Sequence, residues 1–217
     1  IEFEELTRPV LHIGGGSNLL FTDDFKGTVL HSKIDFIEIL EQEAEDSSSV
    51  LVSVGAGVVF DDFCDWAAKE GLWGVENLSD IPGEVGAAAV QNIGAYGVEV
   101  KDVIKTVYCY DTEEEEFVSF SNEDCDYGYR DSAFKDPEIK GRYIVTHVVF
   151  ELSREPRPCL DYGHLKSAVE AAATSDTLTP SLIRRVIIKT RKEKLPDPSV
   201  MGSAGSFFKN PVMPSDH

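Results

Sequence analysis

Small residues dominate one segment of this chain, Ile81–Gly97, and they limit how its backbone can be packed. Gly83, Gly86 and three consecutive alanines fall within a predicted short helix that has Pro82 in its first turn. A helix beginning there would direct its free backbone N–H groups toward an anion such as a pyrophosphate. Tight packing of a helix against a sheet also requires Gly and Ala. The segment therefore predicts close approach of the backbone, either to a flat or anionic ligand or to a sheet.

A second glycine-rich turn, Gly14–Asn18, follows a predicted buried strand. Its glycines would let backbone N–H groups approach a phosphate, and its Ser and Asn side chains would add donors. The turn is not the dinucleotide fingerprint, because Leu19 stands where a third small residue would be, and no lysine follows as in a P-loop. An ordinary glycine turn is the alternative. Together, the two small-residue segments favour a nucleotide cofactor that is not a nucleoside triphosphate.

Hydrophobic patterning along the chain predicts an α+β fold with mixed sheets and few helices. Asp61 and Asp62 are predicted to cap a helix that ends at Gly71, and Thr179 with Pro180 begins another. The predicted strands are Val10–Ile13, Thr28–His31, Ser49–Val54, Val103–Tyr110, Glu116–Ser119 and Tyr143–Leu152.

Composition restricts the partners that this chain can have. A formal net charge of −19 argues against a nucleic-acid surface, which needs clustered Lys and Arg. The four cysteines are far apart and form no CxxC pair, so neither a zinc site nor a disulfide framework is predicted. No apolar run approaches the length of a membrane span. We therefore expect a cytoplasmic protein without membrane insertion or a metal.

Three polar motifs in the second half of the chain are candidates for substrate chemistry. Arg130, between an aromatic residue and an aspartate, is suited to fork a carboxylate, although an exposed salt bridge is the simpler interpretation. Lys194 ends a helix before a rigid proline turn, where charge complementarity with the helix is the alternative. Ser206 stands between Gly205 and Phe207, so its hydroxyl is presented to donate a proton or a hydrogen bond.

These motifs, in this order along essentially the whole chain, resemble those of the UDP-N-acetylenolpyruvoylglucosamine reductase family. The resemblance is carried by Gly14–Asn18, Ile81–Gly97, Tyr127–Lys135, Tyr162-Gly163 and Lys194–Asn210. It implies an FAD-binding fold of the vanillyl-alcohol-oxidase type, and Tyr162 matches the form of the family that closes a tyrosine-bearing loop over the substrate. NADPH would reduce FAD, and the flavin would then pass hydride to the vinyl carbon of UDP-N-acetylglucosamine enolpyruvate, in peptidoglycan precursor synthesis.

The resemblance implies a role for each matching residue. Arg130 would stabilise the charge that develops on the substrate carboxylate, and Ser206 would deliver the proton as general acid. Tyr129, Tyr162, Lys194 and Asn210 would contact the substrate. The residues implied in FAD binding are Gly14, Gly15, Gly16, Ser17, Asn18, Pro82, Gly83, Val85, Gly86, Ala87, Asn92, Gly94, Ala95, Tyr96 and Gly97.

The same resemblance predicts how the chain is divided. Residues 1–45 would be the remainder of a first FAD-binding lobe, 46–195 a second, and 196–217 the beginning of a substrate-binding lobe. Family members begin before Val10 and continue past Pro211 into a lobe that supplies a catalytic glutamate, so the chain is expected to be a fragment. We also expect a monomer. The alternatives are another FAD-dependent oxidoreductase of the same fold and a non-catalytic flavin- or nucleotide-binding module.

Overall fold

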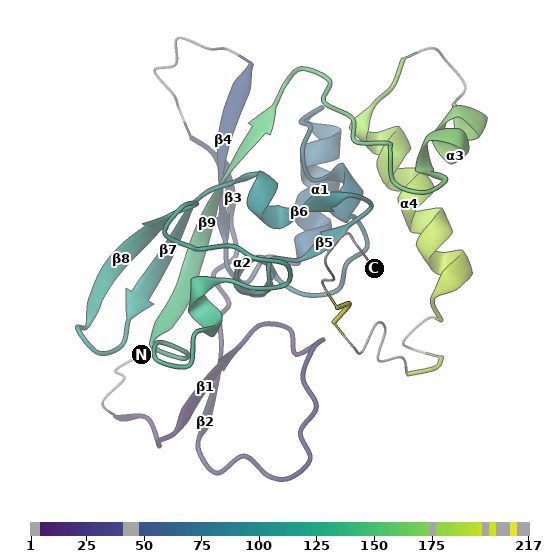
Figure 1. The fold of residues 1–217 in the computed structure, drawn as a ribbon. Coiled ribbons are helices and arrows are strands. Elements are labelled where there is room, and N and C mark those ends of the chain that lie inside the picture. The colour runs from purple at the N-terminus through teal and green to yellow at the C-terminus, as the bar shows by residue number, and fades with distance from the viewer. Residues whose placement is uncertain (1–4, 41–47, 174–176, 197–199, 203–208, 212–217) are drawn as a thin grey trace.

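The computed structural model describes residues 5–40, 48–173, 177–196, 200–202 and 209–211, and Ser206 lies outside these ranges. Its largest element is an antiparallel five-stranded sheet with the order β3-β4-β9-β7-β8. The central strand β9 pairs on one side with β4 and on the other with β7 (Figure 1). The strands of this sheet are β3 (Ile37–Ile39), β4 (Ser49–Gly55), β7 (Ile104–Asp111), β8 (Glu116–Ser121) and β9 (Tyr143–Ser153).

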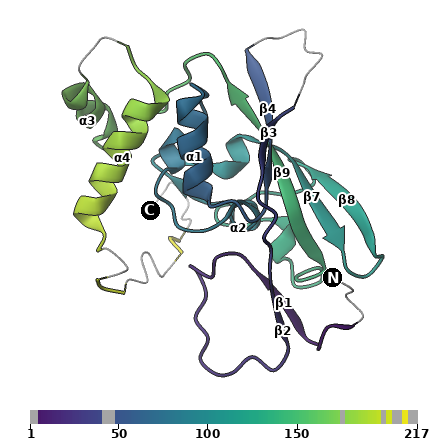
Figure 2. The same ribbon diagram turned by 180° about the vertical axis from the view of Figure 1, so that it is seen from behind.

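Two helices cover one face of the sheet, α1 (Phe60–Lys69) and α2 (Val85–Gln91) (Figures 1 and 2). The ring of Phe63 lies 4.7 Å from that of Phe150 on β9, and both side chains are fully buried. Burying two such rings removes a large apolar area from water, so this contact anchors α1 to the sheet.

The starts of both helices differ from the prediction. Helix α1 has Val59 as its N-cap, and Asp61 and Asp62 lie in the first turn instead of capping it. Carboxylates there still stabilise the positive end of the helix. Helix α2 begins at Val85 and not at Pro82, because Glu84 is extended and forms an antiparallel bridge with Val59.

A second, smaller core lies beside α1. Helix α3 (Leu165–Ala172) packs against α4 (Pro180–Lys194), and the sequence had not predicted α3. The Thr179 hydroxyl accepts a hydrogen bond from the Leu182 N–H, which confirms the predicted cap. Polar contacts tie α4 to α1, where the Arg184 guanidinium donates to Asp61 and Asp65. The buried side chains of this core are Trp73, Leu165, Val169, Leu182, Ile183, Val186 and Ile187.

Two small β elements complete the fold. The strands β1 (Val10–Ile13) and β2 (Thr28–His31) form a parallel pair below α2 (Figure 1). The strands β5 (Gly94–Ala95) and β6 (Val98–Glu99) form a hairpin. Short 3-10 helices cover Glu76–Leu78, Val100–Asp102 and Ala133–Lys135.

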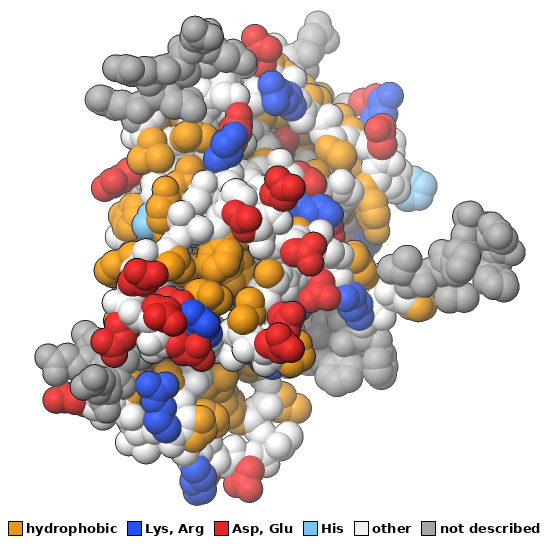
Figure 3. All heavy atoms as spheres, turned by 60° about the vertical axis from the view of Figure 1, so that its left-hand side comes forward, with side chains coloured by type: hydrophobic (Ala, Val, Ile, Leu, Met, Phe, Trp, Pro, Cys, Tyr) orange, Lys and Arg blue, Asp and Glu red, His pale blue; other side chains and the backbone are white. Residues whose placement is uncertain are grey.

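The predicted division at residue 45 separates β3 from the sheet to which it is hydrogen-bonded, since β3 pairs with β4. The division into lobes stays a prediction. Figure 3 shows acidic side chains gathered on one face among apolar ones, as the net charge of −19 leads one to expect. Among the described residues, no helix has the length and apolar character needed to span a membrane.

Candidate functional site

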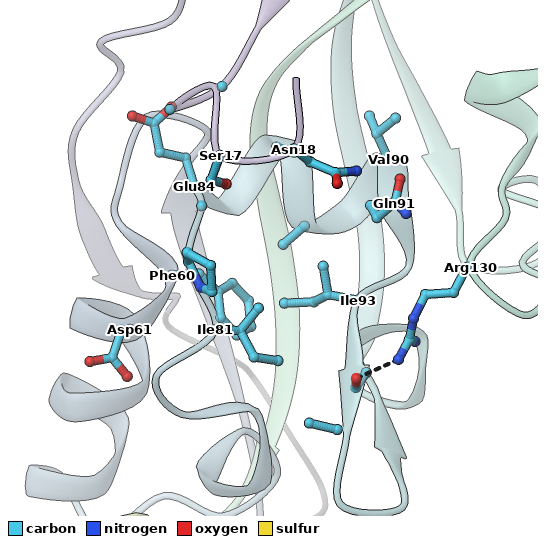
Figure 4. Close-up of a pocket in the computed structure, with 18 of the residues that line it drawn as sticks. Ser17, Asn18, Phe60, Asp61, Ile81, Glu84, Val90, Gln91, Ile93 and Arg130 are labelled. Carbon is cyan, nitrogen blue, oxygen red and sulfur yellow. Dashed lines mark hydrogen bonds between the residues drawn. The ribbon is translucent and has the colours of Figure 1, made fainter. Parts of the chain in front are cut away.

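A cavity of about 1890 Å³ lies between α2, the turn after β1 and the C-terminal end of α4. Its volume is about twice that of the larger small-molecule pockets of proteins, which reach about 1,000 Å³. Figure 4 shows its walls, with Ser17 and Asn18 reaching in from the turn after β1 and Arg130 from the opposite side. The cavity therefore has room for a large cofactor together with a substrate.

The turn Gly14–Asn18 forms one wall of the cavity. It is closed by a hydrogen bond from the Leu19 N–H to the Gly16 carbonyl (3.2 Å). Gly16 has φ +73° and no atom near its absent Cβ, so it faces open space. A Cβ at Gly14, by contrast, would stand 2.9 Å from the Cβ of Ala87. The turn thus presses against α2 on one side and leaves its backbone open on the other.

Helix α2 is the floor of the cavity, and its first two N–H groups are already hydrogen-bonded within the protein. The Val85 N–H donates to the Val58 carbonyl (2.9 Å), and the Gly86 N–H donates to the Ala56 carbonyl (3.0 Å). These two N–H groups are therefore not available to a pyrophosphate, and anion binding by the rest of the segment stays a prediction. A Cβ at Gly86 would be 2.9 Å from the Cβ of Ala56, so tight helix packing explains this glycine.

Asn92 ends α2 in the left-handed conformation (φ +47°) and is fully buried. Its side-chain amide donates to the Gly128 carbonyl (2.7 Å), and its oxygen accepts from the Lys101 N–H (3.2 Å). Neither Asn92 nor Val85 lines the cavity. Both predicted cofactor contacts are thus placed behind the wall, where Asn92 joins α2 to the loop that carries Arg130.

Arg130 is held in the cavity wall by the hairpin β5–β6. Its guanidinium donates to the carbonyls of Asn92 (3.2 Å) and Gly94 (2.5 Å) and lies 3.4 Å from the Glu99 carboxylate. Its side chain remains 27% exposed, so a ligand in the cavity can reach it. The Lys135 ammonium, whose pKa is lowered by burial, donates to the Arg130 carbonyl. Arg130 is therefore both fixed and accessible, and it is more than an exposed salt bridge.

The hairpin turns at Tyr96 (φ +50°) and Gly97 (φ +83°). Positive φ at both central residues is the pattern of a type I′ turn, which joins two strands closely. The Tyr96 ring packs edge-on against Tyr162 with centroids 5.9 Å apart, and both rings line the cavity. Burial raises the pKa of the Tyr96 phenol. These two aromatic side chains together form part of the cavity wall.

The last part of the wall comes from α4 and from the residues near the C-terminus. The Arg191 guanidinium donates to the carbonyl (3.1 Å) and the carboxylate (3.3 Å) of Asp80. The Asn210 amide donates to the Tyr129 hydroxyl (3.4 Å), and both residues line the cavity. Lys194 instead lines a neighbouring cavity of about 160 Å³, together with Tyr162.

The structure thus brings most of the predicted site residues to one cavity. Those that line it are Gly14, Gly15, Gly16, Ser17, Asn18, Pro82, Gly83, Gly86, Ala87, Gly94, Ala95, Tyr96, Gly97, Tyr129, Arg130, Tyr162 and Asn210. His12, Glu84 and Glu99 also line the cavity and were not predicted from the sequence. Nothing local in the sequence distinguishes them from ordinary polar residues, since Glu84 pairs with the distant His31 and Glu99 with the distant Arg130. Within the described ranges, no group of His, Cys, Asp or Glu is arranged to hold a metal ion.

Residues 2–120 match the model of the FAD binding domain family, and the chain belongs to this family. This match and the described architecture confirm the predicted α+β FAD-binding fold.

Within this class, the chain is similar in sequence to UDP-N-acetylenolpyruvoylglucosamine reductases, and this similarity confirms the predicted resemblance. The chain is 54% identical over 208 residues to that reductase of Bacteroides fragilis (strain YCH46), covering 96% of this chain and 60% of the relative. It is 46% identical over 207 residues to that of Neisseria meningitidis serogroup A, covering 95% and 59%. The chain therefore spans about 60% of the length of the curated relatives it matches.

A solved structure shares the fold. It is the UDP-N-acetylenolpyruvylglucosamine reductase from Thermus caldophilus, which is 24% identical and superposes with a TM-score of 0.62 over 95% of this chain and 62% of that one.

Proposed function

We propose that this chain is the FAD-binding part of an NADPH-dependent reductase of UDP-N-acetylglucosamine enolpyruvate. The reaction would run in the cytoplasm, in peptidoglycan precursor synthesis. One observation carries the proposal: the open glycine turn and the fixed, accessible guanidinium of Arg130 line the same cavity. Identity of 54% to a reductase with this name supports it.

The residues present fit a flavin dinucleotide. The Gly14–Asn18 turn faces open space at Gly16 and carries the Ser17 and Asn18 side chains into the cavity, which suits a diphosphate. The small residues of α2 and the Tyr96–Tyr162 wall leave space for a flat ring. When bound, FAD supplies hydride transfer from NADPH to the vinyl carbon of the enolpyruvyl group.

Arg130 would stabilise the substrate carboxylate as negative charge develops on it. Its contacts with two backbone carbonyls orient the guanidinium before the substrate arrives, and preorganised donors lower the barrier because they need no rearrangement. Asn210, which donates to the Tyr129 hydroxyl, and Tyr162 would contact the sugar nucleotide. Lys194, in the adjoining cavity behind Tyr162, would contact its diphosphate.

Ser206 would protonate the substrate carbon next to the one that receives hydride. A serine hydroxyl is a weak acid in water, so a neighbouring group must assist it. The proposal for Ser206 rests on its motif in the sequence, because the residue lies outside the described ranges.

The two half-reactions of the intact protein test the proposal. Flavin absorbance is followed in a stopped-flow instrument, first with NADPH and then, after reduction, with the enolpyruvyl sugar nucleotide. Ser206→Ala should leave the first step unchanged and slow the second by about 10²- to 10⁴-fold, the usual contribution of general acid catalysis.

Ser203→Ala, the same substitution three residues earlier, is the matched control and should slow neither step. Equal loss of both steps in Ser206→Ala would assign Ser206 to folding or flavin binding. A protein that takes up no FAD would refute the proposal as a whole.

A further inference from the structure

Three titratable side chains, His12, His31 and Glu84, lie together beneath the glycine turn. They come from β1, from β2 and from the residue that precedes α2, and His12 and Glu84 line the cavity. The His31 Nε2 is 2.8 Å and 2.9 Å from the two carboxylate oxygens of Glu84. The His12 Nε2 is buried and has no hydrogen-bond partner among the described residues. Nothing in the proposed chemistry uses these groups.

The Glu84 carboxylate is placed directly against the backbone of the turn. A Cβ at Gly14 would be 3.4 Å from its Oε2, and a Cβ at Gly15 would be 3.7 Å from its Oε1. The Glu84 side chain is only 8% exposed, so water screens its charge poorly. A diphosphate bound to this turn would therefore meet a buried like charge unless a cation neutralises it.

His31 is the residue placed to neutralise Glu84. Its Nε2 faces both carboxylate oxygens of Glu84, and 31% of its side chain is exposed. The Lys33 ammonium lies 3.4 Å from the His31 Nε2. His12 is less suited to this role, because burial and the nearby His31 lower its pKa and its Nε2 has no hydrogen-bond partner among the described residues.

We propose that His31 is a positioning residue of the cofactor site, which neutralises and orients Glu84 so that the diphosphate of a dinucleotide can bind to the Gly14–Asn18 turn. The inference rests on the proposed FAD binding and adds two residues to it. Glu84 itself packs against the turn from the residue that precedes α2, and His31 makes its charge compatible with an anionic ligand.

FAD affinity of the intact protein tests this inference, measured by titrating the apoprotein and following flavin fluorescence. His31→Gln should weaken FAD binding about tenfold or more, because one unneutralised charge then lies close to the diphosphate. The double variant His31→Gln with Glu84→Gln should bind FAD to within about threefold of the wild type, since the repelling charge is gone. A purely structural role of His31 would not be rescued in this way.

His147→Gln is the matched control, because His147 stacks on Tyr108 on the sheet and does not line the cavity. The inference would be overturned if His31→Gln bound FAD with an affinity within twofold of the wild type, or if the double variant bound FAD as weakly as the single variant. The proposed function would stand in either case. Absence of FAD binding in the wild type would instead overturn both.

Discussion

Replacing Gly94 by alanine should disable the substrate half-reaction by displacing Arg130. A Cβ at this position would lie 2.6 Å from the Arg130 Nη1 and 2.9 Å from the Val98 carbonyl oxygen. Ordinary contacts of this kind are about 3.5–4 Å. The Val98 carbonyl is restrained, because residues 94 and 95 pair with 99 and 98 in the hairpin. The guanidinium is the more movable partner and must give way by about 1 Å, and the hairpin backbone must also adjust at Val98.

That displacement has two costs. The first is stability, because moving the guanidinium breaks its hydrogen bonds to the carbonyls of Asn92 and Gly94. Added methyl groups in packed positions typically cost about 1–3 kcal/mol, and we expect about 2 kcal/mol in the free energy of unfolding. The second is catalysis, since a 1 Å misplacement of a group that orients the reaction can cost about 100-fold in rate.

Stopped-flow measurement of the two half-reactions separates these costs. Gly94→Ala should reduce FAD with NADPH at close to the wild-type rate and pass hydride to the enolpyruvyl substrate about 100-fold more slowly. Gly128→Ala is the matched control, because its new methyl would lie at an ordinary 3.4 Å from the Asp131 Cβ, two residues from Arg130. A substrate step within twofold of the wild type in Gly94→Ala would refute the claim that the hairpin positions Arg130.

Three further predictions concern stability. Thr179→Ala removes the hydroxyl that accepts from the Leu182 N–H and should lower the free energy of unfolding by about 1 kcal/mol in urea titrations, whereas Thr179→Ser should not. Ile187→Ala, at a fully buried position of the smaller core, should cost about 2–5 kcal/mol in the same assay. The Arg142 guanidinium lowers the pKa of Asp111 from 3.8 to about 2, so the wild type should lose stability as pH falls from 4 toward 2. Asp111→Asn should make this loss smaller in urea titrations at each pH, and an unchanged loss would exclude a contribution from Asp111.

Much of the fold could be predicted because its strands and its last helix carry their own local signals. The apolar run of β9 and the cap, proline and buried face of α4 lie within the elements themselves. The strand β3 has three residues and takes its structure from pairing with β4, so no local pattern marked it. The prediction placed the start of α2 near Pro82, which was wrong because Glu84 is extended and pairs with Val59. No local pattern in the sequence indicates this bridge, since the two residues are far apart along the chain.

The parts of the candidate site that need small residues for close backbone approach could be predicted from the sequence. The parts that depend on pairing between distant residues could not. Glycines marked the turn after β1 and the hairpin, and both line the cavity. His31 and Glu84 are 53 residues apart, and neither lies in a pattern that indicates a partner. Asn92 illustrates the opposite error. It belongs to a cofactor-like motif, but its amide is used to hold the loop before Arg130.

The close contacts beneath the cavity make its floor a stack of very small side chains from three separate segments. Ala56 lies against Gly86, and the next residue, Ala87, lies against Gly14. A Cβ added at either glycine would be 2.9 Å from the Cβ of the facing alanine. No residue of this stack can be replaced by a larger one unless its neighbour is replaced by a smaller one or the backbone moves. A larger side chain at one position of a contact pair therefore requires a compensating substitution at the other position. Reshaping the cavity by mutation would likewise require changing Gly14 together with Ala87, or Gly86 together with Ala56.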